Sequence, residues 1–271
     1  MQAYSHLTLV LFYVKLSTMS RQNRGKLNRL LLNWPKGVIY TSKWMKNQGF
    51  SRQLLDRYKK SNWLMPVGTG AYKLANDTVN WTGALYAIQN QLELNCHPGG
   101  KTALQLKGLA HFVPGELKEI FIFGPPGEKL PSWFKAYDWE VEVHYSLTNL
   151  FNNDLGLTKE DFGTFSISIS SAERAIMEML YLVPQKQTLN ESSLIMENLV
   201  SLRPKTVQAL LENCNSIKVK RLFMLLAEKH EHQWVKKLDF SRFNLGTGKI
   251  ALTRGGVYNR KFKIVIPNIS G

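Results

Sequence analysis

The pattern of apolar and polar positions near the start of the chain predicts a series of short helices. Between residues 27 and 34, apolar side chains recur at the i, i+3, i+4, i+7 spacing of one helix face, and Pro35 ends this first helix. Thr41 or Ser42 can cap a short second helix, which Gly49 ends with the small residue that a tight turn between helices requires. A third helix is expected directly after this turn.

The third helix and a hairpin complete a winged helix-turn-helix in this prediction. Ser51 can cap the third helix, whose apolar positions leave basic and amide side chains on the outward face. In the extended run that follows, Gly68 and Gly70 flank Thr69, a spacing suited to the tight turn of a wing. We therefore expect a winged helix-turn-helix domain over residues 19–75.

From residue 76 onward the pattern becomes that of a mixed α/β domain, expected to extend to residue 271. Ser170 and Glu173 match a capping box ahead of an apolar helical run. The predicted fold class is α+β, an N-terminal winged helix-turn-helix followed by a mixed α/β C-terminal domain. The pattern also predicts helices at 81–94, 101–109, 188–202, 204–214 and 217–230, and strands at 119–123, 139–145, 165–170, 249–254 and 262–266.

Charge changes the picture, because it is unevenly distributed. The 271 residues include 35 Lys and Arg against 20 Asp and Glu, a net charge of +15. Residues 21–73 hold twelve basic residues and one acid, a net +11; residues 74–213 hold ten and sixteen, a net −6; residues 214–271 hold twelve and three, a net +9. Such asymmetry indicates a binding surface for a polyanion, with nucleic acid the leading class of partner.

The third helix carries the chemistry that DNA recognition requires. Arg52 and Gln53 occupy its first turn, where Arg can donate two hydrogen bonds to guanine and Gln can pair with adenine. Other basic residues are expected at phosphates, which position the protein without reading sequence. A protein-docking role for the winged helix is the alternative. The candidate DNA-binding residues are Lys43, Arg52, Gln53, Arg57, Lys59, Lys60, Thr69 and Lys73.

The C-terminal block interleaves basic residues with aromatic ones. That composition suits single-stranded nucleic acid, which needs cations for the backbone and ring faces for the bases. It is equally compatible with aromatics that point into the core, Phe240, Phe243, Tyr258 and Phe262 among them, beside lysines that are merely solvated. The candidate basic face comprises Lys218, Lys220, Arg221, Lys236, Lys237, Arg242, Lys249, Arg254, Arg260 and Lys261.

Enzymatic motifs are not evident. Gly100, Lys101 and Thr102 match the end of a phosphate-binding loop, but Asn95 stands where its first glycine belongs, so a helix-entry turn is the better interpretation. The histidines lack the spacing of a metal-binding helix. The two cysteines, far apart, indicate no disulfide or zinc site, which fits a reducing cytoplasm. We expect no catalytic residue, metal or cofactor.

The first residues contain an apolar run, Leu7 to Leu16, that is too short to span a membrane. No basic residue precedes Lys15, so the run does not match a secretory signal either. Met19 opens the strongly basic segment. We therefore expect residues 1–18 to be an upstream extension of a chain that starts naturally at Met19, and we expect no membrane association.

Several blocks in a fixed order resemble the AbiEi family of bacterial antitoxins. They are the basic winged helix, WTGALYAIQNQL, HPGGKTALQLKGLAH, FIFGPPGEKLPSWFK, ISSAERAIMEMLYLVP and VKRLFMLLAEK, spanning about Leu27 to Ile266. The resemblance implies a type IV toxin–antitoxin system, associated with abortive infection and phage resistance, whose toxin is an AbiEii-like nucleotidyltransferase.

The same resemblance implies a division of labour between the two domains. The winged helix would repress its own promoter by binding inverted repeats in double-stranded operator DNA. The C-terminal domain would supply antitoxin activity, which in type IV systems is thought to need no stable complex with the toxin. The alternatives are a nucleic-acid-processing enzyme delivered by the winged helix, or a winged-helix regulator unrelated to a toxin.

Overall fold

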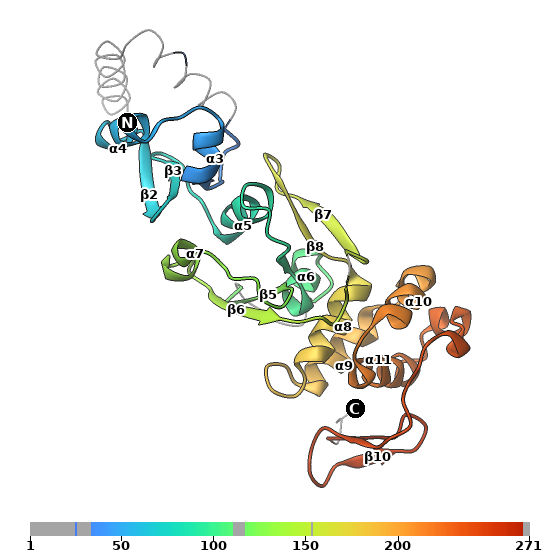
Figure 1. The fold of residues 1–271 in the computed structure, drawn as a ribbon. Helices are drawn as coiled ribbons and strands as arrows, with labels where there is room; N and C mark the ends of the chain where they lie inside the picture. Colours follow the sequence, from blue (N-terminus) through green and yellow to red (C-terminus); the bar gives the residue numbers. More distant parts are fainter. Residues whose placement is uncertain (1–24, 26–33, 111–116, 153, 268–271) are drawn as a thin grey trace, which may run out of the picture.

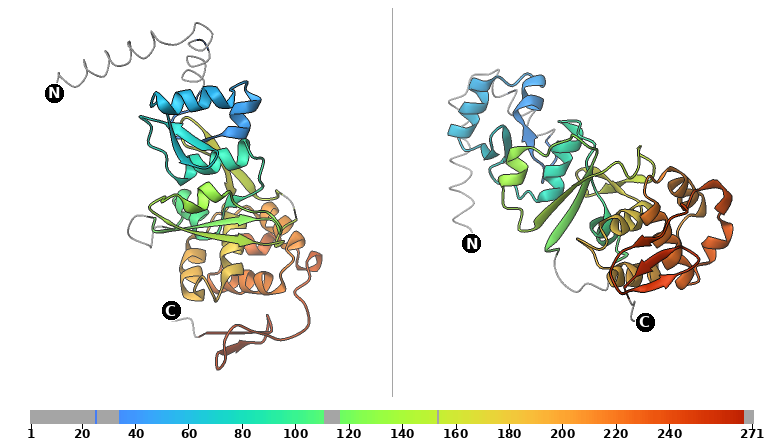
Figure 2. Two further views of the ribbon diagram at one scale, coloured as in Figure 1. Left: turned by 60° about the vertical axis from the view of Figure 1, so that its left-hand side comes forward. Right: turned by 60° about the horizontal axis from the view of Figure 1, so that its bottom comes forward.

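The computed structural model describes residue 25 and residues 34–110, 117–152 and 154–267. The molecule is elongated, with the N-terminal elements at one end, a central mixed region, a group of helices, and a small sheet at the other end (Figures 1 and 2). Three large clusters of buried apolar side chains follow the same order along the chain. The predicted α+β fold class is confirmed.

The N-terminal elements form a winged helix-turn-helix. The described part consists of β1 (Tyr40–Thr41), α3 (Ser42–Asn47), α4 (Arg52–Lys60), β2 (Leu64–Gly68) and β3 (Ala71–Leu74). β3 lies between β1 and β2 and is antiparallel to both. The helix predicted at 27–34 lies outside the described residues except for Trp34, which is buried.

Capping hydrogen bonds explain where these two helices begin. The side chain of Thr41 accepts a hydrogen bond from the Trp44 backbone N–H at 3.3 Å, and that of Ser51 accepts one from the Leu54 N–H at 3.3 Å. Gly49, at φ +83°, makes the turn between the helices in a conformation that favours glycine. Both helices therefore have the predicted caps. Of the two candidates for the first of them, Thr41 and Ser42, it is Thr41 that caps α3.

The central region surrounds a small mixed sheet. β5 lies between β4, which is antiparallel to it, and β6, which is parallel; β7 and β8 form a separate antiparallel pair. The elements are α5 (Trp81–Asn90), β4 (His97–Pro98), α6 (Gly100–Leu106), β5 (Glu119–Gly124), α7 (Ser132–Ala136), β6 (Glu142–Leu147), β7 (Leu157–Asp161) and β8 (Ser166–Ser170).

The C-terminal region packs helices around one core and ends in a three-stranded sheet. β11 lies between β10, antiparallel, and β9, parallel. The elements are α8 (Ala172–Leu182), α9 (Leu189–Asn198), α10 (Pro204–Asn213), α11 (Ile217–Lys229), η1 (Gln233–Lys237), η2 (Phe240–Arg242), β9 (Ile250–Ala251), β10 (Val257–Asn259) and β11 (Ile264–Ile266).

Direct contacts hold the winged helix against the central region. The buried side-chain amide of Gln91 accepts a hydrogen bond from the Thr41 N–H at 2.8 Å and donates one to the Ile39 carbonyl at 2.9 Å. The Ile39 N–H donates to the Gly83 carbonyl at 3.2 Å. A Cβ on Gly83 would collide with the backbone of Gly37, so only glycine permits this approach.

One local prediction is wrong, and several short elements were not predicted. Ser171, not Ser170, caps α8, because the Ser170 hydroxyl is already engaged by Glu178. The proline-rich segment between β5 and β6 contains the short helix α7, for which the sequence pattern gave no helical periodicity. Strands β7 and β10 were not predicted, since each is short and carries several polar or glycine neighbours.

Candidate nucleic-acid interface

Helix α4 presents one apolar and one polar face. Leu54, Leu55 and Tyr58 are buried in the winged-helix core, at 6%, 4% and 0% exposure. Because side chains three and four apart share a helix face, this packing directs the remaining side chains outward. The outward set of exposed candidates on α4 is Arg52, Gln53, Arg57 and Lys60.

Electrostatics divide the cations of α4 into two groups. Lys59 is half-buried, with its Nζ 2.6 Å from Asp56 Oδ1 and 5.8 Å from the centre of the Tyr72 ring. The hydrogen bond from Lys59 lowers the pKa of Asp56. No acid among the described residues forms an ion pair with Arg52 or Arg57. Lys60 is likewise exposed without an ion pair to a described residue, so Arg52, Arg57 and Lys60 are the cations of α4 best placed to meet an external anion.

The other N-terminal candidates surround this helix at different positions. Lys43 is exposed on α3, and Lys73 is half-buried on β3. Thr69 is exposed in the hairpin turn, but its neighbour Gly68 lies against α7, where a Cβ would be 2.7 Å from that of Trp133. Figure 1 shows the β2–β3 hairpin directed toward α7 and away from α4. The structure thus groups the basic residues of α4 and separates the wing turn from them.

The C-terminal candidates do not form one exposed face. Lys220 and Arg221 are 6% and 1% exposed, so the expectation of exposure is wrong for both. Arg221 donates hydrogen bonds from Nε to the Leu245 carbonyl at 2.6 Å, and from Nη1 to those of Gly248 at 2.6 Å and Lys263 at 3.0 Å. Its guanidinium therefore ties α11 to the C-terminal sheet.

Lys218 also faces inward. Its Nζ donates to the carbonyls of Tyr181 at 2.7 Å and Val183 at 2.6 Å. Burial lowers the pKa of Lys218. Helix α11 is covered by α8 and α9 on one side. The charges of Lys218 and Arg221 are neutralised by backbone carbonyls instead of being presented to solvent.

The remaining C-terminal candidates are exposed, although two are paired. Arg242 lies 2.9 Å from Glu212, and Lys261 lies 2.6 Å from Glu228. Among the aromatics, Phe243 and Phe262 belong to the core, whereas Phe240 and Tyr258 are exposed. The exposed candidates without an ion pair to another described residue are Lys236, Lys237, Lys249, Arg254 and Arg260.

The glycine-rich segment at 95–102 is structural. Lys101 is 8% exposed, with its Nζ 2.6 Å from Glu191 Oε1. The Thr102 hydroxyl accepts a hydrogen bond from the Phe121 N–H at 2.8 Å. Both side chains are therefore committed to protein partners, as expected for a helix-entry turn.

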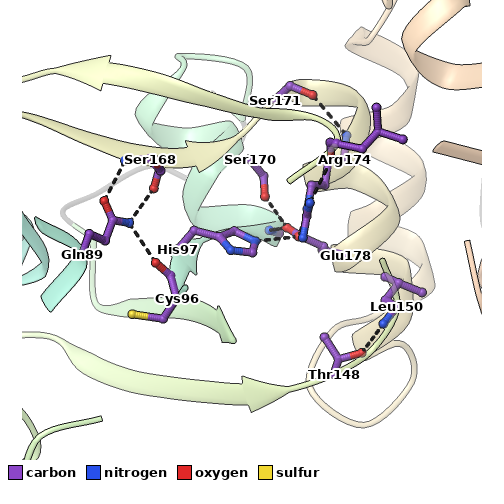
Figure 3. Close-up of polar contacts among 12 residues, drawn as sticks. Gln89, Cys96, His97, Thr148, Leu150, Ser168, Ser170, Ser171, Arg174 and Glu178 are labelled. Carbon is purple, nitrogen blue, oxygen red and sulfur yellow. Dashed lines mark hydrogen bonds and ion pairs between the residues drawn. The ribbon is translucent and has the colours of Figure 1, made fainter. Parts of the chain in front are cut away.

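A buried polar network, which the sequence did not indicate, joins β4, β8 and α8 (Figure 3). Glu178 Oε1 lies 2.9 Å from His97 Nε2 and 2.7 Å from Arg174 Nε, and Oε2 accepts from the Ser170 hydroxyl at 2.6 Å and the Gly100 N–H at 3.2 Å. Burial alone raises the pKa of Glu178, but His97 and Arg174 outweigh it and hold the pKa at about 2.

This network explains the Pro-Gly-Gly turn and borders a cavity of about 490 Å³. A Cβ on Gly99 would overlap the Glu178 carboxylate, so glycine is required there. The only sequence signal was the i, i+4 spacing of Arg174 and Glu178, which on most helices marks a surface pair. The Glu178 carboxylate is held by Arg174 and His97, which fits a structural role for this network.

The fold is that of a winged-helix protein. The second helix of its helix-turn-helix, α4, has a basic, exposed face. The chain belongs to the AbiEi antitoxin family: residues 117–267 match "Transcriptional regulator, AbiEi antitoxin, Type IV TA system" and residues 23–114 match "Transcriptional regulator, AbiEi antitoxin N-terminal domain". The resemblance noted in the sequence is thereby confirmed. A search of curated proteins finds no match.

Structural similarity extends across most of the chain. The crystal structure of the RV2827C protein from Mycobacterium tuberculosis matches with a TM-score of 0.58 and 14% identity, over 84% of this chain and 86% of that chain. At this identity the match supports the fold alone. No helix within the described residues is long and apolar enough to cross a membrane.

Proposed function

We propose that this protein is a transcriptional autorepressor and the antitoxin of a type IV toxin–antitoxin system. The proposal rests on Arg52, Arg57 and Lys60 of α4, which are exposed and form no ion pair within the described residues, in a winged helix of an AbiEi-family chain. We assign DNA binding to residues 19–75 and antitoxin activity to residues 76–271. The protein would act in the cytoplasm, where its operator lies.

Operator recognition follows from the geometry of α4. A recognition helix enters the major groove with its N-terminal residues nearest the base edges. Arg52 and Gln53 are exposed in that first turn. Arg57 and Lys60, farther along the helix, are suited to phosphates, with Lys43 and Lys73 as further phosphate contacts. The proposed ligand is double-stranded DNA with inverted repeats in the protein's own promoter.

Antitoxin activity is proposed from family membership. The toxin would be an AbiEii-like nucleotidyltransferase, counteracted without any requirement for a stable complex. The exposed C-terminal cations, from Lys236 to Arg260, are the candidate residues for this activity. Arg221 and Lys220 are left out because their side chains are buried.

Operator binding is tested by salt titrations with DNA from upstream of the gene and with scrambled DNA. We expect the wild type to prefer its own DNA by about a thousandfold. The Arg52→Ala/Arg57→Ala variant should lose this preference, and each lost phosphate contact should reduce the salt slope by about 0.9. The matched control, Lys236→Ala/Lys237→Ala, removes the same charge far from α4 and should bind normally.

A growth assay with the neighbouring nucleotidyltransferase separates the two activities. The Arg52→Ala/Arg57→Ala variant should still neutralise the toxin, because its C-terminal region is unchanged. Equal loss of repression and neutralisation in this folded variant would contradict the division of labour. Absence of any preference for the upstream DNA in the wild type would overturn autorepression itself.

A further inference from the structure

The C-terminal sheet has one face packed on the helices. Phe262, Ile264 and Ile266 belong to the large helical core, and Ile250 packs against it. Successive side chains of a strand point to opposite faces of the sheet. The residues between these positions on β9 and β11 therefore lie on the face that points away from the core.

The outward face carries an aromatic ring next to a cation. Register pairs Tyr258 on β10 with Val265 on β11, and Val265 with Ala251 on β9, so these three side chains share the outward face. Val265, on the central strand, is buried, whereas Ala251 and Tyr258 on the outer strands are exposed. Tyr258 is 43% exposed, so its ring is accessible from solvent. The Nζ of Lys249 lies 5.0 Å from the centre of the Tyr258 ring, and Lys249 is itself exposed.

Further exposed cations flank β10 in the sequence and form no ion pair within the described residues. Arg254 and Arg260 are exposed just before and just after β10, and neither forms an ion pair with a described residue. Lys263, also exposed, donates to the Thr247 carbonyl at 3.5 Å, on the segment that leads into β9. After Asp239 the sequence contains no acidic residue at all.

We propose that this outward face binds single-stranded nucleic acid. Phosphates would contact Lys249, Arg254 and Arg260, and a base would stack on Tyr258, the combination that single-strand binding surfaces use. The flexible Lys249 side chain can move from the ring to an adjacent phosphate as the base stacks. A duplex keeps its bases stacked on one another, so the exposed ring favours a single strand.

This surface is distinct from the proposed operator site. Figures 1 and 2 show the C-terminal sheet at the opposite end of the molecule from α4. The proposal goes beyond autorepression and does not require it. Binding must therefore be measured in a protein whose α4 cations have been removed.

The test uses the full chain carrying Arg52→Ala/Arg57→Ala, with anisotropy of a labelled thymidine oligonucleotide of about twelve nucleotides, the uridine RNA of equal length and a matched duplex. We expect both single strands to bind more tightly than the duplex, and their ratio to identify DNA or RNA as the preferred strand. In the same background, Tyr258→Ala should weaken binding about tenfold, whereas Tyr258→Phe retains the ring and the affinity.

Charge variants complete the experiment. Lys249→Ala/Arg260→Ala should weaken binding and reduce the salt slope by about 0.7 for each lost phosphate contact. Lys129→Ala/Lys135→Ala, an equal loss of exposed charge outside both proposed surfaces, should leave affinity unchanged. Failure of both single strands to bind, equal affinity for the duplex, or an equal effect of this control pair would overturn the proposal. Normal operator binding by the protein with intact α4 would show that this failure leaves autorepression standing.

Discussion

Two basic helices of this protein use their charge in opposite ways. On α4, Arg52 and Arg57 are exposed and have no acidic partner among the described residues. On α11, Lys220 and Arg221 are buried, and Arg221 hydrogen-bonds to three carbonyls. Each helix carries four basic residues and one acid, a net charge of +3. A basic helix therefore indicates a binding surface only where its cations lie on the solvent-exposed face, opposite the apolar face that packs into the core.

The largest effect on stability is expected at Glu178, because its buried carboxylate on α8 also binds side chains of β4 and β8. Glu178→Gln would leave Arg174 and His97 without their anion, and we expect a loss of about 3–5 kcal/mol in the free energy of unfolding. Urea denaturation measures this. Asp56→Asn on exposed α4 is the matched control and should change stability by at most about 0.5 kcal/mol. Equal effects of the two substitutions would remove the contrast between buried and exposed charge.

The same carboxylate predicts acid sensitivity. The folded-state pKa of Glu178, about 2, lies below its ordinary value of 4.5, so its stabilising contribution is complete above about pH 5 and is lost as the pH falls toward 2. Glu173, whose pKa is also held at about 2, acts in the same direction because Arg203 outweighs its burial. Glu178→Gln should flatten the stability curve between pH 5 and about 2. An unchanged pH profile would argue against the ionised pair.

Arg221 allows a direct test of the contrast between a buried and an exposed cation. Arg221→Ala would strip three carbonyls of their donor, and we expect a cost of about 2–4 kcal/mol. Arg254→Ala, which removes an equally charged but exposed side chain, should cost no more than about 0.5 kcal/mol. Thermal and urea unfolding of both variants provide the measurement. A small loss for Arg221→Ala would mean that its charge is available for binding after all.

The contact between the winged helix and α5 tests how firmly the N-terminal and central regions are joined. Gly83→Ala places a methyl group against the Gly37 backbone, and we expect a cost of about 1–3 kcal/mol as the two regions separate locally. Protease cleavage near residues 75–80 should increase. Gly127→Ala is a glycine control with open space around it, although its positive φ adds a modest strain. Normal protease resistance in Gly83→Ala would indicate that the contact is easily rearranged.

The smallest predicted effect concerns DNA affinity. Asp56→Asn would release Lys59 from its ion pair and remove the only acid of the N-terminal basic segment. We expect affinity for the upstream DNA to rise a few-fold, in line with an exposed ion pair worth about 1 kcal/mol or less. Weaker binding would show that Asp56 positions Lys59 or contacts a base donor instead.

Local signals predicted the N-terminal region well. Thr41 and Ser51 cap their helices, as expected for hydroxyl residues that precede a helical pattern of apolar positions. Leu54, Leu55 and Tyr58 are buried, as their spacing indicated. The strand at 139–145 was less accurate, because β6 begins only at Glu142, where pairing with β5 starts. Pairing between distant segments, which sets such boundaries, leaves no local signal.

By itself the sequence determined the α+β class, the winged helix, the family and the exposed basic character of α4, because periodicity, caps and charge are properties of neighbouring residues. The tertiary structure alone decided that Glu178 meets His97 across 81 positions and that Arg221 faces inward. It also decided that Tyr258 stays on the surface while Phe262 enters the core. The physical reason is that burial depends on which distant elements cover a side chain, and packing, not composition, settles that.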